Sequence, residues 1–269
     1  MSVIIRSKLL ITDGVVVFII TGGGSGIGKA LALALAKQGQ SVLIIGRREQ
    51  ALQETASASP LIKYLRADVS TDEGLHAIQS HVSNVSNISG LVNNAGTLGP
   101  IVPIREMKRE EWHHTLRTNV DAPLFLSQLL YDKLNNGRVL NIGSQAAYFA
   151  IKGWSAYCSS KATLAMLSQC WQLESQSVAF ASVKPGIIDT DMQTIARAGV
   201  NMDSEHTQFY RRLKENNRLI APETVAEFLS WLLLTVDRDT YVSQEWDIYE
   251  TGHHHHWLKP PHQVLPWEF

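Results

Sequence analysis

Short apolar segments rich in β-branched residues alternate with longer helical patterns along almost the whole chain. Strict alternation of strand and helix predicts parallel strands joined by right-handed crossovers, with helices on both faces of one sheet. The segments expected as strands are 15–20, 41–46, 62–65, 90–93, 137–142, 179–184 and 242–248. The helical patterns lie near 25–38, 48–57, 71–84, 109–133, 155–175 and 222–235. We therefore expect an α/β fold, a doubly wound parallel sheet of about seven strands.

The same pattern predicts the domain organisation. Residues 1–251 are expected to form a single domain with a short N-terminal extension, followed by a tail over 252–269. The tail contains Pro260, Pro261 and Pro266 and so cannot be one continuous helix. Residues 187–220 follow the sixth strand and exceed a normal connection, which indicates a lid or substrate loop.

Charge and cysteine content limit the kinds of binding partner and the cellular compartment that we expect for this protein. The chain has 24 basic and 25 acidic residues and no basic run longer than a pair, which argues against nucleic acid or anionic membrane as the main partner. Only two cysteines occur, which fits a reducing compartment. The start mixes charged with apolar residues and does not look like a signal peptide, and the run VVVFII is too short to span a bilayer. We expect a cytoplasmic protein with a small-molecule partner.

A glycine-rich turn, TGGGSGIGKALALALAKQG, follows the first strand directly. Gly22, Gly26 and Gly28 let the backbone turn tightly and approach a pyrophosphate, whose charge is met by the positive end of the following helix. A turn that merely connects two elements is the alternative. Its position between an apolar strand and an alanine-rich helix favours a Rossmann-like, dinucleotide-binding domain.

The end of the second strand bears on which dinucleotide is bound. NAD-binding folds usually place an acidic residue here, but this chain has Gly46 followed by Arg47 and Arg48. Because the planar guanidinium suits a 2′-phosphate, NADP(H) is predicted over NAD(H), which remains possible. The alternative is that both arginines belong to a solvated start of a helix.

Polar clusters follow three more strands at the same predicted sheet edge: Asp68, the sequence NNAG at 93–96, and Ser144. With these motifs the chain resembles the short-chain dehydrogenase/reductase family from about Val15 to Tyr249. The matches are TGxxxGxG at 21–28, NNAG, a helical Asn119, Ser144, YxxxK at Tyr157/Lys161, and the KPGIIDT turn.

The resemblance implies an NAD(P)-dependent oxidoreductase with a catalytic set and a cofactor-binding set. The catalytic residues would be Asn119, Ser144, Tyr157 and Lys161. The cofactor-binding residues would be Gly22, Gly24, Ser25, Gly26, Ile27, Gly28, Arg47, Arg48, Asp68, Val69, Asn93, Ala95, Gly96, Tyr157, Lys161, Pro185, Gly186, Ile188 and Thr190.

The Tyr157/Lys161 spacing is not unique, because Tyr148/Lys152 and Tyr210/Lys214 repeat it. Residues four apart share one face of any helix, so spacing alone decides nothing. The pair at 157/161 is preferred because it lies in a helical pattern that follows the Ser144 strand end. The Tyr210 segment is expected to be an ordinary exposed helix.

The expected chemistry is proton transfer by Tyr157. A tyrosine hydroxyl titrates near pH 10, and a nearby ammonium is expected to lower that pKa. Tyr157 would donate its proton to a carbonyl oxygen as hydride arrives, and Ser144 would hold the same oxygen. The resemblance adds that Lys161 binds the nicotinamide ribose and that Asn119 anchors a proton-relaying water.

Two further features receive structural interpretations. Cys158 points about 100° away from Tyr157 on a helix and is expected to pack against the core or a partner subunit. The His253–His256 run could bind a metal at the surface, but no functional metal is predicted, and the tail is expected to pack through Trp257 and Trp267.

The motifs KPGIIDTDMQ and NNAGTLGP resemble the sepiapterin reductase/benzil reductase branch, which implies reduction of a medium-sized ketone or vicinal dicarbonyl with NADPH. The alternatives are a dehydrogenase that oxidises a secondary alcohol and a nucleotide-binding protein of this fold without turnover. The family also implies a homodimer or homotetramer that assembles through the helices containing Asn119 and Tyr157.

Overall fold

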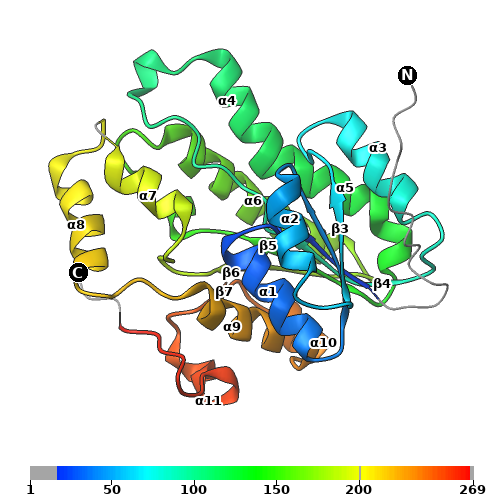
Figure 1. Ribbon diagram of the computed structural model, residues 1–269. Helices are drawn as coiled ribbons and strands as arrows, with labels where there is room; N and C mark the ends of the chain where they lie inside the picture. The colour runs from blue at the N-terminus through cyan, green and yellow to red at the C-terminus, as the bar shows by residue number, and fades with distance from the viewer. Residues whose placement is uncertain (1–16, 200, 267–269) are drawn as a thin grey trace.

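Seven parallel strands form one sheet in the order β3-β2-β1-β4-β5-β6-β7 (Figure 1). The computed structural model describes residues 17–199 and 201–266. The strands are β1 Val17–Thr21, β2 Ser41–Gly46, β3 Ile62–Arg66, β4 Ile88–Asn93, β5 Arg138–Ile142, β6 Ala179–Lys184 and β7 Trp246–Asp247. The strand order reverses between β1 and β4, the point at which ligands bind in such sheets. The predicted doubly wound fold is confirmed.

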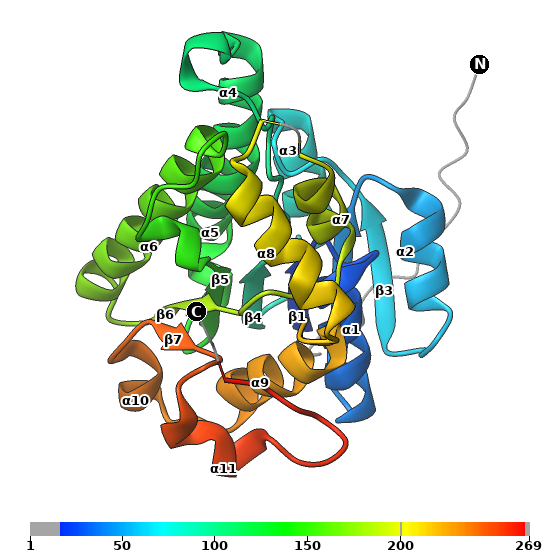
Figure 2. The same ribbon diagram turned by 90° about the vertical axis from the view of Figure 1, so that its left-hand side faces the viewer.

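Helices cover both faces of the sheet, as the alternation of apolar residues along the strands requires (Figures 1 and 2). Phe18 and Ile20 face one apolar core, whereas Ile19 between them faces the other. The first core packs against α1 Gly26–Lys37, α2 Glu49–Ala56 and α9 Pro222–Leu234. The second packs against α3 Asp72–His81, α5 Ala122–Leu130 and α6 Ser155–Glu174.

The helix expected over 109–133 is interrupted at its middle. It consists of α4 Arg109–Leu116, a π-helical turn (η2) over Arg117–Asp121, α5, and a 3₁₀ turn (η3) over Tyr131–Leu134. Pro123, in the first turn of α5, has no N–H to donate to the residue one turn before it. The π-helical turn contains Asn119, and π turns occur often at functional sites.

The connection over 187–220 is folded. It contains α7 Asp191–Ala198 and α8 Ser204–Glu215, which lie over the carboxyl end of the sheet (Figure 2). A bridge between Ile188 and Ile220 brings the two ends of this connection together. The predicted lid is therefore a pair of helices with its own apolar contacts.

The last predicted strand was largely wrong. Residues 242–248 were expected to be extended, but only Trp246–Asp247 pair with β6. The preceding residues form α10 Arg238–Val242, whose first turn is capped by the Asp237 carboxylate through the Thr240 N–H.

The C-terminal segment packs on the domain, as predicted for Trp257. It comprises η5 Thr251–His253 and α11 His254–Trp257, and the buried Trp257 ring lies 4.9 Å from Phe228 of α9. Trp267 and the N-terminal extension lie outside the described residues. The remaining short turns are η1 Ile104–Glu106 and η4 Gln145–Ala147. No helix among the described residues combines the length and apolar character needed to cross a membrane.

Candidate active site

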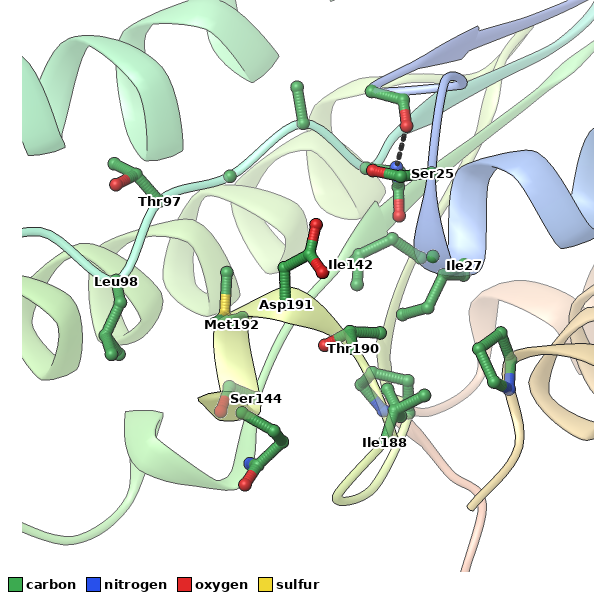
Figure 3. A pocket seen from close by; sticks show the side chains of 18 of the residues that line it. Ser25, Ile27, Thr97, Leu98, Ile142, Ser144, Ile188, Thr190, Asp191 and Met192 are labelled. Carbon is green, nitrogen blue, oxygen red and sulfur yellow. Dashed lines mark hydrogen bonds between the residues drawn. The ribbon is translucent and has the colours of Figure 1, made fainter. Parts of the chain in front are cut away.

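A cleft of about 720 Å³ opens at the carboxyl ends of the strands, beneath the lid helices. Its volume lies in the range of pockets that hold small molecules and cofactors. Figure 3 shows Ser25 and Ile27 of the glycine turn facing the same space as Ser144 and as Asp191 and Met192 of α7. Most predicted site residues line it: Gly22, Gly24, Ser25, Gly26, Ile27, Arg47, Arg48, Asp68, Val69, Ala95, Gly96, Ser144, Tyr157, Lys161, Pro185, Gly186, Ile188 and Thr190.

Two residues predicted to bind cofactor lie behind the cleft wall instead. A Cβ on Gly28 would lie 2.5 Å from the Gly22 carbonyl oxygen, so this glycine permits close packing within the turn. The buried Asn93 amide donates to Asn141 Oδ1 at 2.8 Å and to Ser127 Oγ at 3.3 Å. Both positions shape the cleft from outside it, and their contact with cofactor stays a prediction.

The glycine turn fits a pyrophosphate. Gly22 and Gly26 have φ of +70° and +52°, which L side chains rarely adopt. Within the described chain, the Ser25 side chain makes no capping hydrogen bond and the first turn of α1 holds no acidic residue. The N–H groups at the positive end of α1 therefore remain available to an anion.

The two arginines after β2 lie at the mouth of the cleft. Arg48 donates to Ser25 Oγ at 2.7 Å, which links the second strand end to the glycine turn. Arg47 Nη1 lies 3.8 Å from Asp68 Oδ2. Burial raises the pKa of Asp68, but hydrogen bonds from Ser70 and the charge of Arg47 lower it overall. Asp68 is therefore a carboxylate at neutral pH, and both guanidinium groups are oriented by partners inside the site.

Tyr157 and Lys161 project from one face of α6 into the inner end of the cleft, and both are buried. Lys161 Nζ donates to the Ile142 carbonyl oxygen at 2.6 Å and lies 5.8 Å from the centre of the Tyr157 ring. The Tyr157 hydroxyl forms a hydrogen bond with the Ser144 side chain, and this bond lowers the pKa of Tyr157. The predicted serine, tyrosine and lysine therefore meet at one point.

The pKa values at this point differ from the sequence-based expectation. Burial raises the pKa of Tyr157 above its usual value, and the hydrogen bond with Ser144 offsets only part of this rise. Burial also lowers the pKa of Lys161 to about 8. The expected lowering of the Tyr157 pKa is wrong for the protein alone, because desolvation of the buried hydroxyl outweighs the hydrogen bond with Ser144.

Asn119 does not line the cleft, but its hydrogen bonds hold two segments that do. Its Oδ1 accepts from the Thr97 N–H at 2.9 Å, and its Nδ2 donates to Thr97 O at 2.8 Å and to Ser160 Oγ at 2.9 Å. Ser160 in turn donates to the Tyr157 carbonyl oxygen at 2.8 Å. The π-helical turn thus ties the loop after β4 to α6 at the position of Tyr157.

The two competing tyrosine–lysine pairs have different environments. Tyr148 is exposed outside the cleft and donates to Glu245 Oε2 at 2.5 Å. Tyr210 was expected on an exposed helix, but it is buried and lines the cleft. Its helical neighbour Lys214 does not line the cleft and donates to Asp189 Oδ2 at 2.6 Å. The expectation for Tyr210 is corrected because the lid folds it inward.

Several cleft residues escaped the sequence analysis. Asn94 is part of the NNAG motif, and its Nδ2 donates to Thr21 O at 2.8 Å, so the motif itself could have identified it. The others carry no motif signal, since apolar and aromatic side chains resemble ordinary core residues. They include Leu98, Ala146, Phe149, Ile151, Trp154, Met192 and Tyr210.

Cys158 and His253 of the histidine run are packed within the fold. Cys158 is half-buried against the apolar cluster around Trp154, and burial raises the pKa of its thiol. His253 accepts from Trp257 Nε1 at 2.9 Å and approaches Asp247 O at 2.9 Å. Over residues 17–199 and 201–266, no three His, Cys, Asp or Glu side chains are grouped so that they could hold a metal ion.

Comparison with known proteins places these features in context. The profile of the family described as short chain dehydrogenase matches residues 16–201. Benzil reductase ((S)-benzoin forming) of Bacillus subtilis (strain 168) is 33% identical over 241 residues, covering 87% of this chain and 98% of that protein. Sepiapterin reductase of Meriones unguiculatus is 32% identical over 251 residues, covering 86% and 94%.

A solved structure shares the fold. The crystal structure of the short chain dehydrogenase/reductase YIR035C from Saccharomyces cerevisiae superposes with a TM-score of 0.81 at 28% identity, covering 86% of this chain and 95% of that one.

Proposed function

The chain belongs to the short-chain dehydrogenase/reductase family, and from this membership we propose that it uses NADPH to reduce a ketone or vicinal dicarbonyl of medium size. The observation that carries the proposal is the meeting of Ser144, Tyr157 and Lys161 at the inner end of the cleft. The glycine turn and the two arginines at the other end suit the phosphates of a dinucleotide.

In this proposal the protein moves one proton and orients one oxygen. When bound, the reduced nicotinamide supplies the hydride that the carbonyl carbon accepts. Tyr157 donates its hydroxyl proton to the carbonyl oxygen, so a hydroxyl group replaces the carbonyl, and solvent later restores the proton. Ser144 donates a hydrogen bond to the same oxygen and holds it in place. Lys161, when protonated, stabilises the phenolate that Tyr157 leaves behind.

The lining near Tyr157 favours a neutral, aromatic substrate. Apart from Lys161, the residues that approach Tyr157 from α6, the lid and the loop after β5 are largely apolar or aromatic, among them Ile151, Trp154 and Tyr210. The guanidinium groups of Arg47 and Arg48 lie at the dinucleotide end, and beside Tyr157 the described lining residues offer a phosphorylated substrate no arginine. Benzil and sepiapterin, which name two relatives' activities, are both ring-bearing carbonyl compounds.

Arg48 is proposed to select NADPH through its 2′-phosphate. We expect Arg48→Ala to weaken NADPH binding about 10- to 100-fold while NADH binding changes little, because a charge-assisted hydrogen bond to phosphate is lost. Cofactor fluorescence titration would measure both constants. Arg66→Ala is the matched control, because Arg66 pairs with Glu49 away from the cleft. Equal losses for the two cofactors would contradict the assignment.

We further propose that the protein works in the cytoplasm as a homodimer or homotetramer. Both cysteines are free thiols, which suits a reducing compartment. An apolar strip on the outer surfaces of α5 and α6 suits a subunit contact.

The test of the reaction is nicotinamide oxidation by the purified protein with benzil, a pterin side-chain ketone and simple aldehydes, using NADPH and NADH in parallel. Tyr157→Phe should lower turnover at least ~100-fold with cofactor binding intact, because the proton donor is removed. Tyr148→Phe should retain turnover, since Tyr148 lies outside the cleft. Cofactor binding without turnover of any carbonyl would overturn the proposed reaction.

A further inference from the structure

A second tyrosine lies beside the proposed proton donor. Helix α8 crosses in front of the sheet (Figure 2) and places Tyr210 in the cleft wall. The Tyr210 ring stacks on Trp154 with centroids 5.7 Å apart and planes inclined by 5°. Trp154 meets Tyr157 edge to face at 5.6 Å. One aromatic wall therefore runs from the lid to the reacting position.

The hydroxyl of Tyr210 is available to a ligand. The residue is 7% exposed, yet among the described residues no group hydrogen-bonds to its hydroxyl. The indole nitrogen of Trp154 is fully covered and has no hydrogen-bond partner. The Tyr210 hydroxyl oxygen is not among the fully covered atoms of this kind. Because Tyr210 lines the cleft, a molecule bound there can reach the hydroxyl.

The surroundings keep this hydroxyl a hydrogen-bond donor. Burial raises the pKa of Tyr210 well above its usual value, and the neighbouring Tyr157 and Cys158 raise it further. The hydroxyl is therefore protonated throughout the neutral range. Both tyrosines belong to one buried cluster and both contact the Trp154 ring, so they are close in space.

A purely structural role explains only part of these observations. Packing against Trp154 and Phe209 would hold the lid equally well through a phenylalanine, because only the ring takes part. A core tyrosine normally finds a partner for its hydroxyl, since an unpaired buried polar group costs free energy. A ligand oxygen in the cleft would supply that partner.

We propose that Tyr210 is a substrate-binding residue that selects aryl vicinal dicarbonyls. Its hydroxyl donates a hydrogen bond to the second carbonyl oxygen while Tyr157 and Ser144 hold the reacting one. The Tyr210 and Trp154 rings together pack against an aryl substituent. This inference rests on the proposed carbonyl reduction and adds the substrate class to it.

The experiment separates the hydroxyl from the ring with two variants and three substrates. Tyr210→Phe removes only the hydroxyl, and Tyr210→Leu removes the aromatic ring as well. Benzil carries aryl groups and two adjacent oxygens, deoxybenzoin carries the aryl groups with one oxygen, and diacetyl carries two oxygens without an aryl group. Tyr64→Phe is the matched control, because Tyr64 lies on β3 outside the cleft.

We expect Tyr210→Phe to lower kcat/KM about 3- to 10-fold for benzil and diacetyl and to leave deoxybenzoin unchanged, as loss of one neutral hydrogen bond predicts. Tyr210→Leu should cost a further ~10-fold for the two aryl substrates only. Cofactor binding should match the wild type in both variants, which shows that the fold is kept.

The inference is overturned if Tyr210→Phe affects all three substrates equally, or none of them. It is also overturned if Tyr210→Leu lowers diacetyl turnover as much as benzil turnover. If the wild-type protein turns over none of the three carbonyls, the proposed function itself is contradicted. That outcome differs from an active enzyme whose activity does not change in the Tyr210 variants.

Discussion

At the scale of single residues, burial controls the protons of the site. Removal from water raises the pKa of Tyr157 and lowers that of Lys161 to about 8, because each neutral form is favoured in a low-dielectric setting. Tyr157 therefore holds its proton throughout the neutral range and can act as an acid. Lys161 is charged below about pH 8 and increasingly neutral above it.

The titration of Lys161 predicts that kcat/KM falls at high pH. As pH rises through about 8, Lys161 loses the charge that is proposed to stabilise the Tyr157 phenolate, so kcat/KM for the cofactor, which reports on the free enzyme, should fall. Steady-state reduction rates from about pH 6 to about pH 10 measure this limb.

The control for this prediction is Lys161→Arg. Because a guanidinium stays protonated across this range, any remaining activity should show the limb displaced to higher pH. A profile that keeps its limb near pH 8 in this variant would assign the titration to another group.

At the scale of elements, the turn that carries Ser144 is held from the far edge of the sheet. Gln145, the next residue, donates to Asp247 Oδ2 of β7 at 2.5 Å. Lys184 of β6 lies 3.3 Å from the same carboxylate. The C-terminal segment adds His253, which approaches the Asp247 carbonyl oxygen at 2.9 Å. A two-residue strand thus connects the tail to the serine that is proposed to hold the substrate oxygen.

We expect Asp247→Ala to lower kcat about 10-fold with little change in cofactor binding, because Ser144 loses its fixed position. A double-mutant cycle with Ser144→Ala checks the mechanism. In the absence of Ser144 the Asp247 change should have almost no further effect, since the two residues act through one another.

Glu245→Gln is the matched control for this element. Glu245 neighbours the same lysine at 3.9 Å, and a glutamine can accept from one of the two hydroxyls of Tyr148 and Ser182 and donate to the other. Losses that simply add in the Asp247/Ser144 cycle would show that Asp247 contributes only to general stability.

At the scale of the whole molecule, the outer face of α5 and α6 carries exposed large apolar side chains. Phe125 is 48% exposed, Met166 58% and Leu173 89%. The last two lie on one side of α6 together with the exposed Cys170. A strip of this kind is typical of a subunit contact.

The proposed homo-oligomer predicts a sedimentation result. Wild-type protein should sediment as a dimer or tetramer, and Met166→Glu combined with Leu173→Glu should shift it to a smaller species, because two charges would be buried in the contact. Ile104→Glu is the control, as Ile104 is an exposed apolar residue of η1 and belongs to neither helix. A wild-type monomer would remove the proposal.

Much of this molecule follows from local sequence signals. The alternation of apolar runs with helical patterns was sufficient for the sheet and its two helical layers, because side-chain periodicity reports which face of each element is buried. Motifs at strand ends located the cleft, since parallel strands bring their carboxyl ends to one edge. Tyr157, Lys161, Ser144 and the glycine turn were predictable for this reason.

Only the tertiary structure decided the properties that depend on contacts between distant segments. Tyr210 enters the cleft because α8 folds over the sheet, and no local pattern distinguishes it from an exposed helical tyrosine. Asn93 turns away from the cleft because its partners Asn141 and Ser127 lie on other elements. The raised pKa of Tyr157 comes from the same cause, because desolvation depends on everything packed around the hydroxyl and not on the lysine four residues away.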